Sequence, residues 1–229
     1  MAQNLSTEIL KLYESIVACS NTSAHCPNTI NDKTAGIPPR GFYTESKAGT
    51  VQILIVGKNP GHILDGESEL YRDKSPEEIA KEHLRWGARC FHDYTSFDAN
   101  GRRSLTFHKN ILSYFSYFLD VPKEQVFEHC ALTDIVKCQT QGEQDRLQPV
   151  TIQECFKKHF LRELAVLQPK VIVALGNEAY DYLNQESLKL LHMLPLVKIK
   201  HPSYHYRKDL RESVLASLKQ EIQTAFGRK

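Results

Sequence analysis

The sequence predicts a three-layer α/β/α fold around a central, mainly parallel sheet of about four strands. Residues 51–56 and 170–176 are short apolar runs rich in valine and isoleucine, and each leads to a glycine. Runs of this kind are typical of strands buried on both faces of a parallel sheet. Segments with helical spacing follow both runs, and this alternation indicates a doubly wound arrangement.

The N-terminal region is predicted to be a helix followed by an irregular loop. Residues 7–18 carry apolar side chains at helical spacing, so we expect a helix that ends just before Cys19. Residues 19–49 have no apolar period and are rich in Asn, Thr, Pro and Gly, which predicts a loop. We expect a single domain over residues 1–229, with residues 1–49 as this helix and cysteine-bearing loop.

The rest of the chain alternates between predicted strands and helices. Ser75 is expected to cap a helix that Pro76 opens, and Thr151 to cap a later one. In order, the predicted elements are strand 51–56, helix 75–86, helix 107–119, strand 130–138, helix 151–167, strand 170–176, helix 177–184, strand 196–200 and helix 208–225.

Composition narrows the class of protein. The formal net charge is +2, which neither requires nor excludes nucleic acid, because binding depends on a basic patch. No run of about 18 apolar residues occurs, and the first residues lack the basic start of a signal peptide. We therefore expect a cytoplasmic, nucleoid-associated protein with no membrane partner, whose six cysteines do not form structural disulfides.

Four polar segments stand where the chemistry of such a fold is expected. In open α/β sheets, ligands bind beyond the carboxyl ends of the strands. The residues that directly follow the predicted strands there are the first motif Gly57–Gly61, Asp134, the segment Leu175–Asn177 and the second motif His201–Ser203.

These segments resemble uracil-DNA glycosylases. Gly57-Lys58-Asn59-Pro60-Gly61 resembles their water-activating motif, in the GxNPG form of the mismatch-specific and single-strand-selective branches, and His201-Pro202-Ser203 resembles their second motif. The stretches 132–138 and 168–179 are similar to the iron–sulfur family 4 of bacteria and archaea. Each short motif is weak alone, whereas four in the same order, each after a predicted strand, are a strong signal.

The resemblance implies a role for each motif residue. Glycosidic cleavage places positive charge on the sugar and negative charge on the base. The Asn59 carbonyl would hold water against the sugar carbon, and His201 would donate to the base oxygen; a turn-capping asparagine and a structural histidine are the alternatives. The residues expected to contact the substrate are Gly57, Lys58, Pro60, Gly61, Asp134, Asn177 and Ser203.

Aromatic side chains are expected to support base flipping. Tyr204, His205 and Arg207 resemble a loop that wedges into the minor groove, while Tyr206 could equally belong to the core. The ring that stacks on the flipped base is expected among Phe91, Tyr94 and Phe97, with core packing as the alternative.

Asp134 departs from the family-4 pattern, which has an asparagine that reads uracil at this place. An amide both donates and accepts, whereas an ionised carboxylate only accepts. A base that presents an amino group or an extra N–H would suit such a carboxylate better than uracil does.

Four cysteines suggest a metal centre. Cys138 and Cys155 are separated by sixteen residues, close to the spacing of the last two cluster ligands of family 4, and Cys19 and Cys26 complete a set of four. The first pair departs from the usual CxxC, because six residues separate it and His25 is a rival ligand. We expect a [4Fe–4S] cluster that pins the loops together, with zinc or unligated buried thiols as alternatives.

The sequence therefore predicts a monomeric, monofunctional DNA glycosylase of base excision repair. It would flip uracil or a related deaminated base out of DNA and hydrolyse the N-glycosidic bond, without a nucleotide cofactor. The alternatives are a member that binds uracil-containing or abasic DNA without efficient turnover, a hydrolase in which the first motif grips phosphate, and a metal-stapled interaction module.

Overall fold

Five strands form one mixed sheet in the computed structural model, which describes residues 7–20, 25–63, 66–92, 106–141, 147–186, 194–204, 206–207 and 209–227. Their order is β2-β4-β3-β6-β7. Four of them run parallel, and β2 pairs with β4 in the antiparallel sense at one edge. The α/β class is confirmed, with one strand more than predicted, because the two-residue β2 lies in the segment expected to be irregular. The strands are β2 Tyr43–Thr44, β3 Ile53–Gly57, β4 Cys130–Asp134, β6 Val171–Leu175 and β7 Leu196–Ile199.

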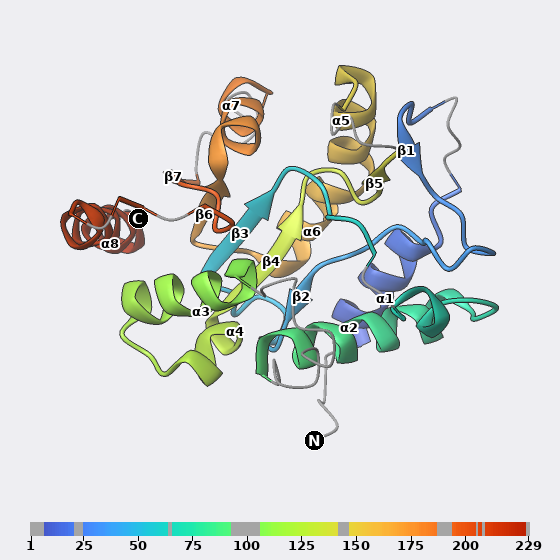
Figure 1. The fold of residues 1–229 in the computed structure, drawn as a ribbon, viewed down its shortest axis with the longest axis horizontal. Helices are drawn as coiled ribbons and strands as arrows, with labels where there is room; N and C mark the ends of the chain where they lie inside the picture. The colour runs from blue at the N-terminus through green and yellow to red at the C-terminus, as the bar shows by residue number, and fades with distance from the viewer. Residues whose placement is uncertain are drawn as a thin grey trace.

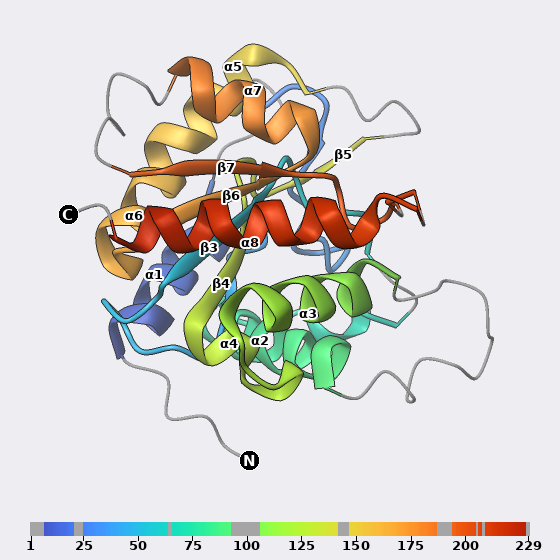
Figure 2. The same cartoon turned by 90° about the vertical axis from the view of Figure 1, so that its left-hand side faces the viewer.

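Helices cover both faces of the sheet (Figure 1). The main helices are α1 Thr7–Val17, α2 Pro76–His92, α3 Thr106–Leu119, α6 Leu161–Leu167, α7 Gly176–Glu186 and α8 Arg211–Gly227. The helices α3 and α8 pack against each other on one face, as Figure 2 shows, while α6 and α7 cover the other. Right-handed crossovers explain why α3 lies on the face opposite to α6 and α7, since the chain moves from β3 to β4 in one direction and from β4 through β6 to β7 in the other. The last helix, α8, follows β7 and packs beside α3.

The structure confirms one predicted helix cap, extends one predicted helix and corrects a second cap. Ser75 caps α2 as expected, since its hydroxyl accepts from the N–H of Glu78 while the Glu78 carboxylate accepts from the N–H of Ser75. The helix continues six residues past Trp86 because Phe91 packs into the core. The cap at Thr151 is wrong: α5 (Pro149–Cys155) begins at its proline, and the buried Thr151 hydroxyl donates to the Pro27 carbonyl.

A two-stranded ribbon ties the N-terminal loop to the segment after β4. In it β1 (Thr29–Ile30) pairs antiparallel with β5 (Gln139–Thr140), beside the main sheet in Figure 1. The predicted strand 130–138 is therefore too long, because the chain leaves the sheet after Asp134 and pairs again only in this ribbon. A π-helical stretch, Phe156–Phe160, follows Cys155 and leads into α6.

The strand order creates a switch point at the carboxyl end of β3. Its two neighbours in the sheet, β4 and β6, lie on opposite sides of it, and both come later in the chain. Ligands of open α/β sheets bind at such a point. The first motif leaves the sheet there. Among the described helices, none is long and apolar enough to cross a membrane.

A buried ion pair lies beneath this edge. The Lys137 ammonium lies 2.7 Å from the Glu163 carboxylate, with both side chains at most 1% exposed. It also donates to the Thr133 hydroxyl at 2.7 Å and to the main-chain carbonyl of Asp134. The pair therefore joins α6 to the end of β4.

We expect Glu163→Ala to lower the free energy of unfolding by about 3–5 kcal/mol, because it leaves a buried ammonium without its counter-charge. The exposed pair Glu77 with Lys81 is the matched control, and Glu77→Ala should cost less than about 1 kcal/mol. Urea unfolding of both variants checks this, and equal losses would contradict it.

Candidate functional site at the carboxyl edge of the sheet

The first motif stays bonded to the chain that leaves β4. The N–H of Ile135 donates to the carbonyl of Gly57 at 3.0 Å, and the N–H of Val136 donates to the carbonyl of Lys58 at 3.0 Å. These bonds continue the parallel pairing in which Gly57 and Asp134 are register partners. Two segments separated by more than seventy residues therefore form one continuous surface.

Gly57 gives the carboxyl group of Asp134 its place. A Cβ atom at Gly57 would lie 2.1 Å from Oδ1 of Asp134, far inside contact distance. Only a residue without a side chain allows the carboxyl to lie against the end of β3.

The carboxyl group of Asp134 is desolvated, although the residue as a whole is partly exposed. Burial raises its pKa to about 6, although the nearby charges of Lys137 and Arg40 lower it, and Glu163 adds a smaller raising effect. Within the described part of the chain, neither carboxyl oxygen has a hydrogen-bond or ion-pair partner. The group is thus held where a ligand could supply the missing partner.

Asn59 and Lys58 of the first motif each have a polar partner, whereas Gly61 faces open space. The Asn59 amide donates to the Pro60 carbonyl at 3.1 Å, which stabilises the turn and leaves the amide oxygen without a partner among the described residues. The Lys58 ammonium pairs at 2.8 Å with Glu178, in the first turn of α7. Gly61 is exposed, and a Cβ there would meet nothing within 4 Å.

The second motif fixes the orientation of its histidine. The N–H of Ser203 donates to Nδ1 of His201 at 3.3 Å. A neutral imidazole that accepts at Nδ1 carries its proton on Nε2, where it can donate. The ring of Phe107, at the start of α3, has its centroid 5.5 Å from that of His201.

Side chains from α3 and from the chain just after the motif hold this loop. The buried Asn110 donates its amide to the Pro202 carbonyl at 2.6 Å. The Tyr206 hydroxyl accepts from the N–H of Lys200 at 2.9 Å, and its ring packs edge-on against Tyr114. Tyr206 therefore supports the loop, as the core alternative predicted.

The start of α7 connects the two motifs. Gly176 has a φ of +83°, and a Cβ there would lie 3.4 Å from Cβ of His201, so a glycine suits both the turn and the contact. Together with the pair between Lys58 and Glu178, this contact places the first motif, Asn177 and the second motif around one helix start. Asn177 itself is exposed.

The segments that the sequence singled out thus share one edge of the sheet. A model of the uracil DNA glycosylase superfamily matches residues 44–223, which include both motifs and Asp134. The chain belongs to the uracil DNA glycosylase superfamily. A sequence search of the curated proteins finds no match.

Two residues of the DNA wedge expected of a uracil DNA glycosylase, Tyr204 and Arg207, are exposed. Tyr204 is 64% exposed, and Ser203 beside it is also exposed. Arg207 is exposed and pairs with Asp209 at 3.0 Å. His205 lies outside the described residues.

Phe91 packs in the core, which was the alternative to a base-stacking role. It is 2% exposed and stacks on Tyr43 with a centroid separation of 5.1 Å, in the core. Tyr94 and Phe97 lie outside the described residues. The aromatic ring that the structure does place beside the second motif, Phe107, was not anticipated, because nothing local in the sequence links α3 to that loop.

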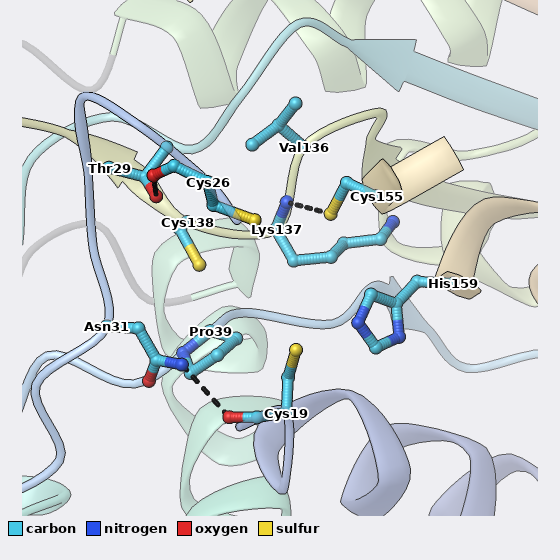
Figure 3. Close-up of a pocket in the computed structure, with 10 residues that line it drawn as sticks. All are labelled: Cys19, Cys26, Thr29, Asn31, Pro39, Val136, Lys137, Cys138, Cys155 and His159. Atoms are coloured by element: carbon cyan, nitrogen blue, oxygen red, sulfur yellow. Dashed lines mark hydrogen bonds between the residues drawn. The ribbon is translucent and has the colours of Figure 1, made fainter. Parts of the chain in front are cut away.

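The four cysteines predicted as ligands line one cavity, together with Lys137, His159 and other residues. Figure 3 shows their sulfur atoms pointing into a common space, with Cys19 from the end of α1, Cys26 from the N-terminal loop, Cys138 before β5 and Cys155 at the end of α5. Cys90 and Cys130 are buried elsewhere and do not line it.

Hydrogen bonds and a strand pairing hold the chain around the cavity. The Asn31 amide donates to the Cys19 carbonyl at 2.9 Å, and the Thr29 hydroxyl donates to the Cys26 carbonyl at 2.7 Å. Together with the β1–β5 ribbon, these bonds hold in place the loop that carries Cys19 and Cys26.

The four cysteine sulfur atoms suit a metal centre that takes thiolate ligands. Burial raises the pKa of the Cys155 thiol to about 12, and burial together with the three neighbouring thiols raises the pKa of Cys138 well above its ordinary value, so a bound metal would have to displace these protons. The N–H of Lys137 donates to Sγ of Cys155 at 3.3 Å, a bond that favours a thiolate. Both ring nitrogens of His159 are buried without a partner among the described residues, whereas His25 is exposed and does not line the cavity.

Gly57→Ala tests the contact between the strands. We expect it to lower the free energy of unfolding by about 1–3 kcal/mol, because the new methyl group must displace the Asp134 carboxyl. Gly61→Ala, whose methyl group enters open space, is the matched control and should change it by less than about 0.5 kcal/mol. Urea unfolding decides, and a neutral Gly57→Ala would show that the carboxyl moves freely.

Proposed function

We propose that this protein is a monofunctional DNA glycosylase that flips a deaminated base out of DNA and hydrolyses its N-glycosidic bond. The observation that carries the proposal is the meeting of the Asn59 loop, Asp134 and the His201 loop at the switch point of the sheet. Membership of the uracil DNA glycosylase superfamily supports DNA as the partner.

The chemistry of each motif matches the charges that develop during cleavage. The Asn59 amide oxygen accepts a hydrogen bond from water and holds it for attack on the electron-poor sugar carbon. His201, with its proton on Nε2, donates to the base oxygen where negative charge collects. Neither residue has to act as a strong base, because the departing base leaves as a stabilised anion.

The exposed Tyr204 and Arg207 suit contact with DNA around the extruded nucleotide. An exposed ring next to the second motif can fill the space that a flipped base leaves, and a guanidinium binds phosphate. We expect the protein to act as a monomer.

We further propose that Cys19, Cys26, Cys138 and Cys155 hold a [4Fe–4S] cluster. Four cysteine sulfur atoms that face one cavity are the ligand set of such a cluster, and zinc, which takes the same set, is the alternative that the metal analysis below separates from it. Bound there, the cluster would join the N-terminal loop to the chain between β4 and α6, with no electron transfer in hydrolysis.

Cleavage of labelled oligonucleotides that carry uracil, hypoxanthine, xanthine or no lesion tests the glycosylase. Alkali reveals the abasic sites. We expect Asn59→Ala and His201→Ala each to slow single-turnover cleavage by about 10²–10³-fold, because each removes a group aimed at developing charge. Asn184→Ala, an exposed site on α7, is the control and should leave the rate unchanged. No cleavage of any substrate by the native protein would instead favour a family member that binds DNA without turnover.

Iron and sulfide assays on anaerobically purified protein test the cluster. We expect both elements in the native protein and their loss in Cys138→Ser, because a cluster needs all four thiolates. Cys130→Ser removes a buried thiol outside the cavity and should retain them. Zinc without iron, or equal metal content in the two variants, would refute the cluster.

A further inference from the structure

We propose that Asp134 reads the target base as a neutral carboxylic acid, so that the site takes bases whose edge offers a donor beside an acceptor, as uracil and hypoxanthine do. The inference rests on the proposed glycosylase function and deepens it. It concerns the protonation state of a single side chain and the class of base which that state selects.

The position of the carboxyl group is the first support. Asp134 ends β4 at the switch point, and its Oδ1 lies against Gly57, the residue that begins the first motif. The main-chain carbonyl of Asp134 is fixed by the Lys137 ammonium, so the residue cannot easily turn away. A base held between the two motifs would therefore meet this carboxyl group.

The missing partners are the second support. A buried carboxylate normally accepts several hydrogen bonds or pairs with a cation. Lys137, the nearest cation of the loop after β4, directs its ammonium to Glu163, Thr133 and the Asp134 main chain. The Asp134 carboxyl oxygens have no partner among the described residues, which favours the neutral form.

The charged groups around the carboxyl act in both directions. Arg40 from the segment before β2 and Lys137 favour ionisation, while burial and Glu163 on α6 oppose it. Burial is the largest effect, and the resulting pKa of about 6 makes the neutral form accessible near physiological pH. A bound base would exclude the remaining water and favour the neutral form further.

The hydrogen-bond pattern then defines the substrate class. Uracil presents N3–H beside O4, and hypoxanthine presents N1–H beside O6. A neutral carboxyl accepts from the N–H through its carbonyl oxygen and donates its O–H to the base oxygen, as an asparagine amide does. An ionised carboxylate would place an unpaired oxygen against the base oxygen and suits only edges with two neighbouring donors.

Single-turnover cleavage of a uracil-containing single strand between pH 5 and 8.5 tests the inference. For the native protein we expect the rate to fall by up to tenfold per pH unit above about pH 6, since the neutral fraction falls in that proportion. Asp134→Asn, whose amide does not titrate, should lose this dependence and exceed the native rate at pH 8. Asp181→Asn changes an exposed aspartate on α7 and should follow the native profile.

The comparison between enzymes separates this inference from the proposed function. Any pH response of His201 or of the DNA is common to the three proteins, so only the difference between native protein and Asp134→Asn counts. Parallel profiles for these two would overturn the inference and leave the glycosylase intact. Absence of cleavage by all three at every pH would overturn both.

Carbon-13 NMR of the aspartate carboxyl groups gives a readout that needs no activity. The Asp134 resonance is identified by its absence from Asp134→Asn. We expect it to titrate near pH 6 in the free protein. Titration near the ordinary value of about 4 would overturn the inference even for an active enzyme.

Discussion

The parallel register between β3 and β4 is the constraint on which the site depends. It makes Gly57 and Asp134 neighbours, and the two main-chain bonds beyond the strand ends keep the first motif and the chain after β4 together. A shift by one residue would turn Asp134 to the opposite face, since side chains alternate along a strand. The buried pair of Lys137 and Glu163 reinforces the register from the α6 side.

Lys137 also connects the site to the cysteine cavity. Its ammonium bonds to the main chain of Asp134, while its own N–H bonds to the sulfur of Cys155. The two features therefore share one short segment of chain, so a group bound in the cavity would affect the position of the Asp134 carboxyl group. The proposed cluster would therefore act on the site through this segment, without taking part in hydrolysis.

The second motif is positioned differently, by contacts that converge from distant parts of the chain. Asn110 from α3 and Gly176 from the β6–α7 turn meet the His201–Ser203 loop, and Tyr206 closes it from within. The local bond from Ser203 then sets the tautomer of the histidine. The loop is thus short in sequence but is held by α3, by the β6–α7 turn and by its own Tyr206.

The sequence by itself determined the alternation of elements, the positions of the main strands and the polar segments that follow them, although it predicted β4 to be too long. Periodicity and capping residues such as Ser75 act over a few positions, so these features can be recognised locally. It could not place β1, β2 or β5, whose two-residue strands exist only because a distant partner pairs with them. The role of Asn110 and the entry of His159 into the cysteine cavity were equally hidden, because neighbouring positions in their helices carry no mark of either contact. Above all, only the tertiary structure decided the pKa of Asp134. The sequence shows an aspartate at this position, but the burial that raises its pKa to about 6 depends on what the fold packs around it.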